Sequence, residues 1–199
     1  STAVSELAGY SMAKSTSDFL LTKGIGKYFY NQNPEPAIKN DNVTMVLTLT
    51  MKGGSVIING KVLDKDANNA VIFEQTAIDT PDVDTLEDGS DSPQAPYAGE
   101  GNFVLLCYED DGTTQASYEV TFDNAETIVT EEVLVDNFDD NVKSQWQDFT
   151  FIPGFGAPVE ADGQFKFALP PAGQSIFAAS TKTSPVFELT EGTRLQFKA

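Results

Sequence analysis

The sequence predicts an all-β fold built from antiparallel strands. Strand-type alternation recurs along nearly the whole chain, the strand patterns are spaced by roughly 8–15 residues with turn residues between them, and helical periodicity is scarce. A chain of 199 residues, 40% of them hydrophobic, can bury a core of its own. About a dozen short strands without intervening helices are typical of an antiparallel sandwich.

The central meander has the clearest strand pattern. Three consecutive segments, Val43–Met51, Ser55–Leu63 and Ala70–Ile78, each predict a strand. The first of them places threonines 44, 48 and 50 on one face and aliphatic side chains on the other. Lys52–Ser55 contains two glycines, which supply the positive φ that a tight hairpin requires. Asp64–Asn69 is rich in Asp and Asn, and we expect a turn there rather than a metal-binding loop.

Shorter strand patterns lie on both sides of the meander. The strand patterns before the meander are followed by the proline-containing loop Asn31–Asn42. Those after it follow Asp79–Gly101, an acidic segment with three prolines that is too polar to pack and too long for a simple turn. The expected strands are Leu7–Lys14, Asp18–Thr22, Ile25–Tyr30, Phe103–Glu109, Ala116–Asp123, Gln147–Ile152, Gln164–Leu169, Ser175–Ser180, Pro185–Glu188 and Thr193–Lys198.

The charge of the chain limits its partners. Thirty acidic residues against 12 basic residues give a formal net charge of −18, which argues against nucleic acid and anionic membrane surfaces as ligands. The balance favours cation binding and a salty, extracellular setting, although an acidic surface that only keeps the protein soluble is the alternative. No run approaches the roughly 18 apolar residues of a membrane span, so no membrane insertion is expected. A secreted chain loses its signal peptide, so the lack of one is compatible with secretion.

Two segments resemble a known family. Val135–Asp140, followed by Trp146, resembles the first strand of concanavalin A-like jelly rolls, and Val120–Ala125 resembles their closing strand. More narrowly, the chain resembles the LamG-like repeats of large secreted bacterial proteins. Gly101–Glu109 and the Met45–Phe73 meander fit the same pattern. The resemblance covers nearly the whole chain, but in circularly permuted order, and it implies that Trp146 packs in the core behind the first strand.

The permuted order predicts how the chain is organised. Residues 1–133 correspond to the C-terminal portion of one repeat and residues 134–199 to the N-terminal portion of the next, together equivalent to one sandwich. Either the chain folds as one permuted jelly roll, or strands of a neighbouring repeat complete it. In the family order, Phe187–Lys198 is expected to pair near Leu7–Lys14. Because an uncompleted edge strand is a template for association, the expected partners are neighbouring copies or repeats, joined by strand completion or tandem linkage.

The resemblance also implies a structural calcium ion beside the terminal strands. The acidic and amide residues at the matching positions are Asp123, Asn124, Asp136 and Asp139. Calcium prefers about six to eight oxygen ligands of this kind. The alternative is that these are turn residues bonded to their own backbone.

A second candidate site is a platform for carbohydrate. Tyr28 and Tyr30 alternate on one face of a predicted strand, beside the polar segment that contains Asn31 and Asn33. Exposed aromatic rings stack on sugar faces and amides bind hydroxyl groups, so these four residues predict polysaccharide binding. The alternative is an ordinary sheet with one face in the core.

Little in the sequence indicates catalysis. The chain has no histidine and a single cysteine, so His-based catalytic sites and internal disulfides are excluded, and Cys107 lies in an apolar run typical of a core residue. Jelly-roll glycoside hydrolases carry a Glu-x-Asp-x-Glu pattern, and Glu160-Ala-Asp162 lacks its third carboxylate. A glycoside hydrolase is nevertheless the one enzyme class that the sequence does not exclude. We therefore expect a non-enzymatic structural or adhesive repeat module of an extracellular bacterial surface or filament-forming protein, stabilised by calcium. The alternative is a carbohydrate-binding module with lectin-like glycan recognition.

Overall fold

The computed structural model describes residues 9–14, 19–24, 28–32, 42–81, 95–102, 104–109, 119–122, 125–128, 132–150, 158–168, 176–183 and 186–199; in parts of these strands only the backbone is described. All regular secondary structure in these ranges is β-strand, and none of them contains a helix that could span a membrane. The strand pairs with a defined register are all antiparallel. The predicted antiparallel all-β class is therefore confirmed.

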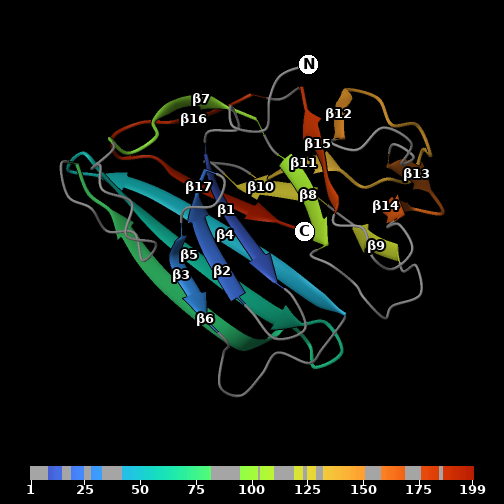
Figure 1. The fold of residues 1–199 in the computed structure, drawn as a ribbon, viewed down its shortest axis with the longest axis horizontal. Coiled ribbons are helices and arrows are strands. Elements are labelled where there is room, and N and C mark those ends of the chain that lie inside the picture. The colour runs from blue at the N-terminus through green and yellow to red at the C-terminus, as the bar shows by residue number, and fades with distance from the viewer. Residues whose placement is uncertain are drawn as a thin grey trace. The chain divides into compact units, whose positions relative to one another are not determined.

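The strands, labelled in Figure 1, are β1 (Tyr10–Lys14), β2 (Phe19–Lys23), β3 (Tyr28–Gln32), β4 (Val43–Lys52), β5 (Ser55–Asp64), β6 (Ala70–Asp79), β7 (Gly99–Gly101), β8 (Val104–Glu109), β9 (Glu119–Phe122), β10 (Ala125–Ile128), β11 (Glu132–Asp136), β12 (Trp146–Thr150), β13 (Val159–Ala161), β14 (Gln164–Ala168), β15 (Ile176–Lys182), β16 (Phe187–Leu189) and β17 (Arg194–Lys198). The chain forms two compact units. Unit 1 comprises Ser1–Glu100, Thr127–Val133 and Glu188–Ala199, and unit 2 comprises Gly101–Glu126 and Leu134–Phe187.

The predicted meander forms the centre of unit 1. Strands β4, β5 and β6 pair in sequence order, with Val43 opposite Asp64 and Lys52 opposite Ser55. Gly53 and Gly54 have φ values of 61° and 75°, as a tight hairpin requires. In the second turn, Asp64 Oδ1 accepts hydrogen bonds from the backbone N–H groups of residues 66 and 67, at 2.9 and 3.2 Å. The turn predicted at Asp64–Asn69 is thereby confirmed.

Strand β17 joins β4 on the other side of the meander. The sheet order is β11-β10-β17-β4-β5-β6, and Leu195 lies opposite Leu49. The expectation that Phe187–Lys198 pairs near Leu7–Lys14 is wrong, because β1 pairs with β2 instead. The β17–β4 register places Leu195, 3% exposed, beside the buried Leu49, so apolar burial favours this pairing.

A second sheet, β1-β2-β3, packs against β4–β6, as the blue strands in Figure 1 lie over the cyan and green ones. Gly60 on β5 marks the closest approach: a Cβ atom there would lie 2.8 Å from both Leu21 Cδ2 and Phe19 Cζ. The Phe19 ring also lies 4.8 Å from that of Phe73. Apolar residues of both sheets are fully buried at this contact: Phe19, Leu21, Val56, Ile58 and Val62.

The face assignment predicted for Val43–Met51 is confirmed, with one addition. Leu47 and Leu49 lie opposite Gly60 and Ile58, so the aliphatic face points into the core of unit 1. The threonine face is also covered, since Thr44 and Thr48 are 7% and 6% exposed. Strand β4 is thus buried on both faces.

Several strand boundaries differ from the prediction, and β7 lies at the end of the predicted loop Asp79–Gly101. Strand β3 covers Tyr28–Gln32 and so extends beyond the predicted end at Tyr30, with Gln32 opposite Phe19, whereas predicted residues 25–27 lie outside the described residues. The segment predicted as one closing strand, Val120–Ala125, contributes to two strands, β9 and β10, in different sheets. Strand ends are set by the length of the partner strand, which a single sequence pattern does not contain.

Unit 2 contains two three-stranded sheets, β12-β15-β8 and β13-β14-β9. Its described core is aromatic: the Phe165 ring lies 5.4 Å from Phe138, 4.9 Å from Trp146 and 5.4 Å from Phe167. Trp146 is 7% exposed, so its predicted core position is confirmed. Cys107 lies opposite Ala178 in the β8–β15 pair, but its side chain lies outside the described part of the structure.

Candidate functional site

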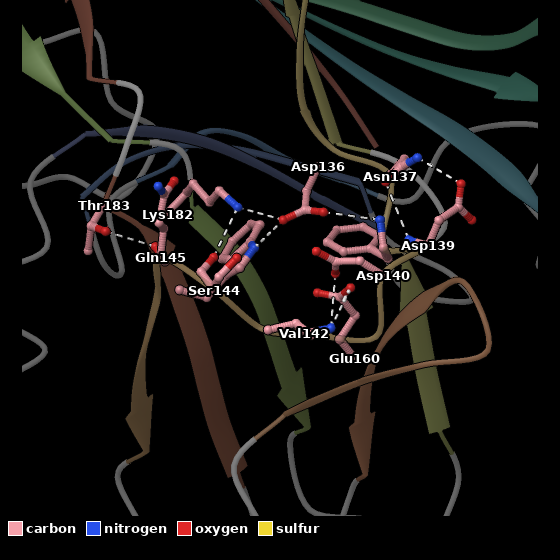
Figure 2. Close-up of polar contacts among 12 residues, drawn as sticks. Asp136, Asn137, Asp139, Asp140, Val142, Ser144, Gln145, Glu160, Lys182 and Thr183 are labelled. Carbon is pink, nitrogen blue, oxygen red and sulfur yellow. Dashed lines mark hydrogen bonds and ion pairs between the residues drawn. The ribbon is translucent and has the colours of Figure 1, made fainter.

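A group of buried charged side chains lies at the ends of strands β11, β12 and β15. Trp146 is paired directly opposite Lys182, whose Nζ lies 5.1 Å from the indole ring centroid. Lys182 Nζ also lies 2.5 Å from Asp136 Oδ2, and Trp146 Nε1 donates a 2.8 Å hydrogen bond to the same oxygen. Figure 2 shows the ammonium group and the carboxylate facing each other. The two side chains are only 6% and 13% exposed, so this ion pair is largely shielded from water.

The environment of Asp136 keeps it charged. Burial opposes ionisation, but the hydrogen bonds from Lys182, Trp146 and the Phe138 N–H outweigh it and hold the pKa of Asp136 below its usual value. The Phe138 N–H lies 3.0 Å from Oδ1, so both oxygens of this carboxylate have donors from the chain itself. Asp136 therefore acts as the acceptor of a buried ion pair.

The loop after Asp136 is held by side-chain-to-backbone hydrogen bonds that span two residues. Asp136 accepts from residue 138, Asn137 from Asp139 at 3.3 Å, and Asp140 from Val142 at 2.9 Å. Asn137 Nδ2 also donates to Asp139 Oδ2 at 2.7 Å. This is the bonding expected of turn residues, the alternative to calcium in the sequence. Phe138 itself has a φ of 59° and no exposed surface, an uncommon backbone conformation stabilised by packing in the aromatic core.

Two carboxyl groups converge on one backbone N–H. The Val142 N–H donates to Asp140 Oδ1 at 2.9 Å and to Glu160 Oε1 at 3.2 Å, as the dashed lines in Figure 2 show. Glu160, on β13, is 7% exposed, and within the described residues its Oε2 has no hydrogen-bond partner. Burial, the contact with Asp140 and the negative charges of Asp136 and Asp140 raise the pKa of Glu160 to about 7, against a small opposing effect of the Val142 N–H.

Positive charge beside Glu160 would stabilise this arrangement. Two ionised carboxylates repel each other at such short range, and a buried oxygen without a donor is costly. A shared proton relieves both problems, and so does a bound cation that accepts the free oxygen as a ligand. We call Asp140 and Glu160 the carboxyl pair. It can hold either a proton or a cation, and which one it holds depends on pH and on cation concentration.

In the sequence, Glu160 was considered only as part of an incomplete hydrolase pattern, and neither its contact with Asp140 nor the role of Lys182 was predicted. Glu160 lies opposite the fully buried Phe165 in the β13–β14 pair, and Lys182 lies opposite Trp146. Neighbouring residues of a strand point to opposite faces, and Val159 is exposed while Glu160 is buried. This alternation is the one sequence signal that could have indicated an acid facing the core. That signal becomes readable only once the strand register is known.

The predicted site residues are described in part. Asp136 and Asp139 lie in the same loop, whereas Asp123 and Asn124 lie outside the described residues. Among the residues that are described, no group of three or more acidic, cysteine or histidine side chains is placed to hold a metal ion. For the carbohydrate platform, Tyr28, Tyr30 and Asn31 belong to β3 with only their backbone described, and Asn33 is outside the described ranges.

A scan against protein-family models, a search of curated proteins and a search of solved structures each returned no match to this chain. The resemblance to concanavalin A-like repeats therefore stays a prediction.

Proposed function

We propose that this chain is a non-enzymatic structural or adhesive repeat module of an extracellular bacterial protein. In this proposal it folds as a jelly-roll sandwich of the concanavalin A-like, LamG-like type and associates with neighbouring copies of itself. The observation that carries the proposal is the outer edge of strand β6, with which no described strand pairs.

Strand β6 lies at the end of its sheet and is ten residues long. Among the described strands, none pairs with its outer side. Val71 and Ile78 on this strand are 56% and 50% exposed, and Glu74 is its one exposed charged residue. Proteins that stay monomeric protect such edges with charges, prolines, bulges or short strands, and β6 carries one bulge, between Val71 and Phe73. A long and partly apolar edge instead favours pairing with the same edge of a second copy around a two-fold axis.

The strand pairing supports association by strand completion. Strand β17 pairs with β4, β15 with β8, and β14 with β9. In each pair one strand comes from residues 1–133 and the other from residues 134–199. Each portion of the chain thus supplies strands that the other portion needs. In a tandem array, equivalent strands of adjacent repeats meet the same requirement.

The chemistry of the described residues supports a structural role over a hydrolase. Glu160 resembles a general acid in its raised pKa, but its side chain is buried and accepts a hydrogen bond from the Val142 backbone. Asp136 is bound to Lys182 and Trp146. These acids stabilise the loop and the core of unit 2.

Self-association is expected to depend on the β6 edge. We expect sedimentation velocity to detect dimers or larger species as concentration rises, more readily at high salt because salt screens the net charge of −18. The double substitution Val71→Lys with Ile78→Lys places charge on the edge and should leave the protein monomeric. Val186→Lys, at a valine that is 51% exposed and outside β6, is the matched control. A wild-type chain that stays monomeric over a wide concentration range would contradict the proposal.

Calcium is part of the proposal, and its best-supported ligands differ from those expected. Asp136 fits a calcium ion poorly because Lys182 already neutralises it, whereas the carboxyl pair offers the partnerless Glu160 Oε2. We expect calcium to raise the melting temperature relative to chelator, by an amount equivalent to about 2.7 kcal/mol at a hundredfold excess over Kd. Glu160→Gln should abolish the shift and the exposed-residue control Glu188→Gln should retain it. A shift that survives in Glu160→Gln would place calcium elsewhere, for example at Asp123 and Asn124.

A further inference from the structure

A buried lysine and a buried aspartate face each other in unit 1. Lys23 ends β2 and Asp79 ends β6, and their side chains are 2% and 3% exposed. Lys23 Nζ lies 2.8 Å from Asp79 Oδ2 and 3.1 Å from Oδ1. The nitrogen is therefore within hydrogen-bond distance of both carboxylate oxygens. Removing both ions from water is costly, and their mutual attraction offsets that cost only in part.

Aromatic groups complete the surroundings of this pair. The Tyr10 hydroxyl donates a 2.6 Å hydrogen bond to Asp79 Oδ2 and accepts one from the Tyr97 N–H at 2.9 Å. Lys23 Nζ also lies 5.3 Å from the centroid of the Tyr97 ring. Burial, followed by the hydrogen bond to Asp79 and its charge, raises the pKa of Tyr10, so the phenol remains a donor throughout the physiological range.

We propose that Lys23 and Asp79 condense to an intramolecular isopeptide bond that joins β2 to β6. One ammonium proton first passes to the Asp79 carboxylate. The lone pair that this frees on Nζ attacks Cγ of Asp79, and the C–O bond to the protonated oxygen breaks. Of the three ammonium protons, one stays on the amide nitrogen and two leave with the departing oxygen as water. The overall change is ammonium plus carboxylate to amide plus water, which needs no oxidant, reductant or co-reactant.

The surroundings favour this reaction in three ways. Fixed contact between two reacting groups corresponds to an effective concentration of about 10⁵ M or more in well-oriented cases. A neutral amide is less costly to bury than an ion pair, so burial shifts the balance away from the salt form that water favours. Tyr10 donates to an oxygen that gains negative charge during the attack, and it acts as a catalytic residue by stabilising that charge.

Such a bond would cross-link the chain covalently, which a single cysteine cannot do through an internal disulfide. One cysteine permits no internal disulfide. An amide between residues 56 positions apart restricts the unfolded chain as a disulfide does, without dependence on redox conditions. The inference is independent of the proposed self-association and of calcium.

Intact-mass spectrometry of the denatured wild-type protein tests the proposal directly. The mass should be about 18 Da below that calculated from the sequence, the loss of one water. Digestion with trypsin and a glutamyl endopeptidase should yield Ser15–Lys27 linked to Gln75–Glu87, because the modified Lys23 resists trypsin. A wild-type protein with full mass and normal cleavage at Lys23 would overturn the proposal and leave an ordinary ion pair.

Variants identify the groups involved. Lys23→Arg keeps the charge but should show the full mass, and Asp79→Asn should lose about 17 Da as ammonia instead. Tyr10→Phe should slow the reaction and yield a mixture of linked and unlinked protein. Lys61→Arg is the control, since its ion pair with Glu74 is 35% and 44% exposed, and it should retain the mass loss. If a variant fails to fold, the wild-type mass still decides the outcome.

Discussion

Replacing Lys182 with methionine is expected to destabilise unit 2 by about 3–5 kcal/mol, because the substitution leaves Asp136 as a buried charge without its counter-ion. Methionine keeps most of the apolar stem that covers Trp146 and removes only the ammonium group. Trp146 is the one tryptophan of the chain and lies within this site, so its fluorescence during urea unfolding reports on this unit. The change should appear as a lower denaturation midpoint.

Two further variants separate the loss of the ion pair from other effects. Lys166→Met removes a partner of Asp162, which is 84% exposed, and should cost only about 0–1 kcal/mol. Adding Asp136→Asn to Lys182→Met removes the unpaired charge and should recover part of the lost stability. Equal effects of Lys182→Met and Lys166→Met would show that the buried pair contributes no more than a surface pair.

Glu160→Gln is expected to make the protein more stable at alkaline pH and to remove a pH dependence. The pKa of Glu160 rises from 4.5 to about 7 on folding, so the folded state retains the proton over a range in which the unfolded state loses it. Its contribution to stability is therefore complete below about pH 4.5 and is lost as pH rises to about 7. Since one pKa unit corresponds to about 1.4 kcal/mol, the loss of stability is at most about 3.5 kcal/mol.

The measurement is the free energy of unfolding of wild type and variant between pH 4.5 and pH 8, with calcium and with chelator. In chelator, the difference between the two proteins should grow with pH and level off above about 7. If calcium binds the carboxyl pair as proposed, saturating calcium should reduce that difference, because the cation would replace the proton. The control Glu188→Gln should differ from wild type by a constant amount. A difference that does not vary with pH would exclude proton sharing between Asp140 and Glu160.

The parts of the fold that the sequence predicts are those with local signals. The meander follows from alternation within β4, β5 and β6, and its turns follow from two glycines and an Asp/Asn-rich segment. The β17–β4 pairing has no local signal, since residues 194–198 fit any apolar strand edge equally well. The burial of Leu195 beside Leu49 and the hydrogen bond from Gln196 to Thr48 distinguish the pairing, and both are properties of the assembled sheet.

The residues of the candidate site likewise divide into those with a local sequence signal and those without one. Asp136, Asp139 and Trp146 belong to one motif and were found together. Lys182 and Glu160 decide the electrostatics, yet they lie 46 and 24 positions beyond Asp136 and reach it through pairing of β12 with β15 and β13 with β14. No spacing rule within a single chain connects such residues. Their roles follow from which strand neighbours which, and the sequence leaves that open.

The close packing around Gly60 restricts which substitutions this chain can accept during evolution. With 2.8 Å between a hypothetical Cβ and the tips of Phe19 and Leu21, position 60 cannot gain even a methyl group unless one of those side chains shrinks or moves. The three positions should therefore be inherited as a set. In any sister sequence that carries alanine or serine at position 60, we expect a smaller residue at position 19 or 21.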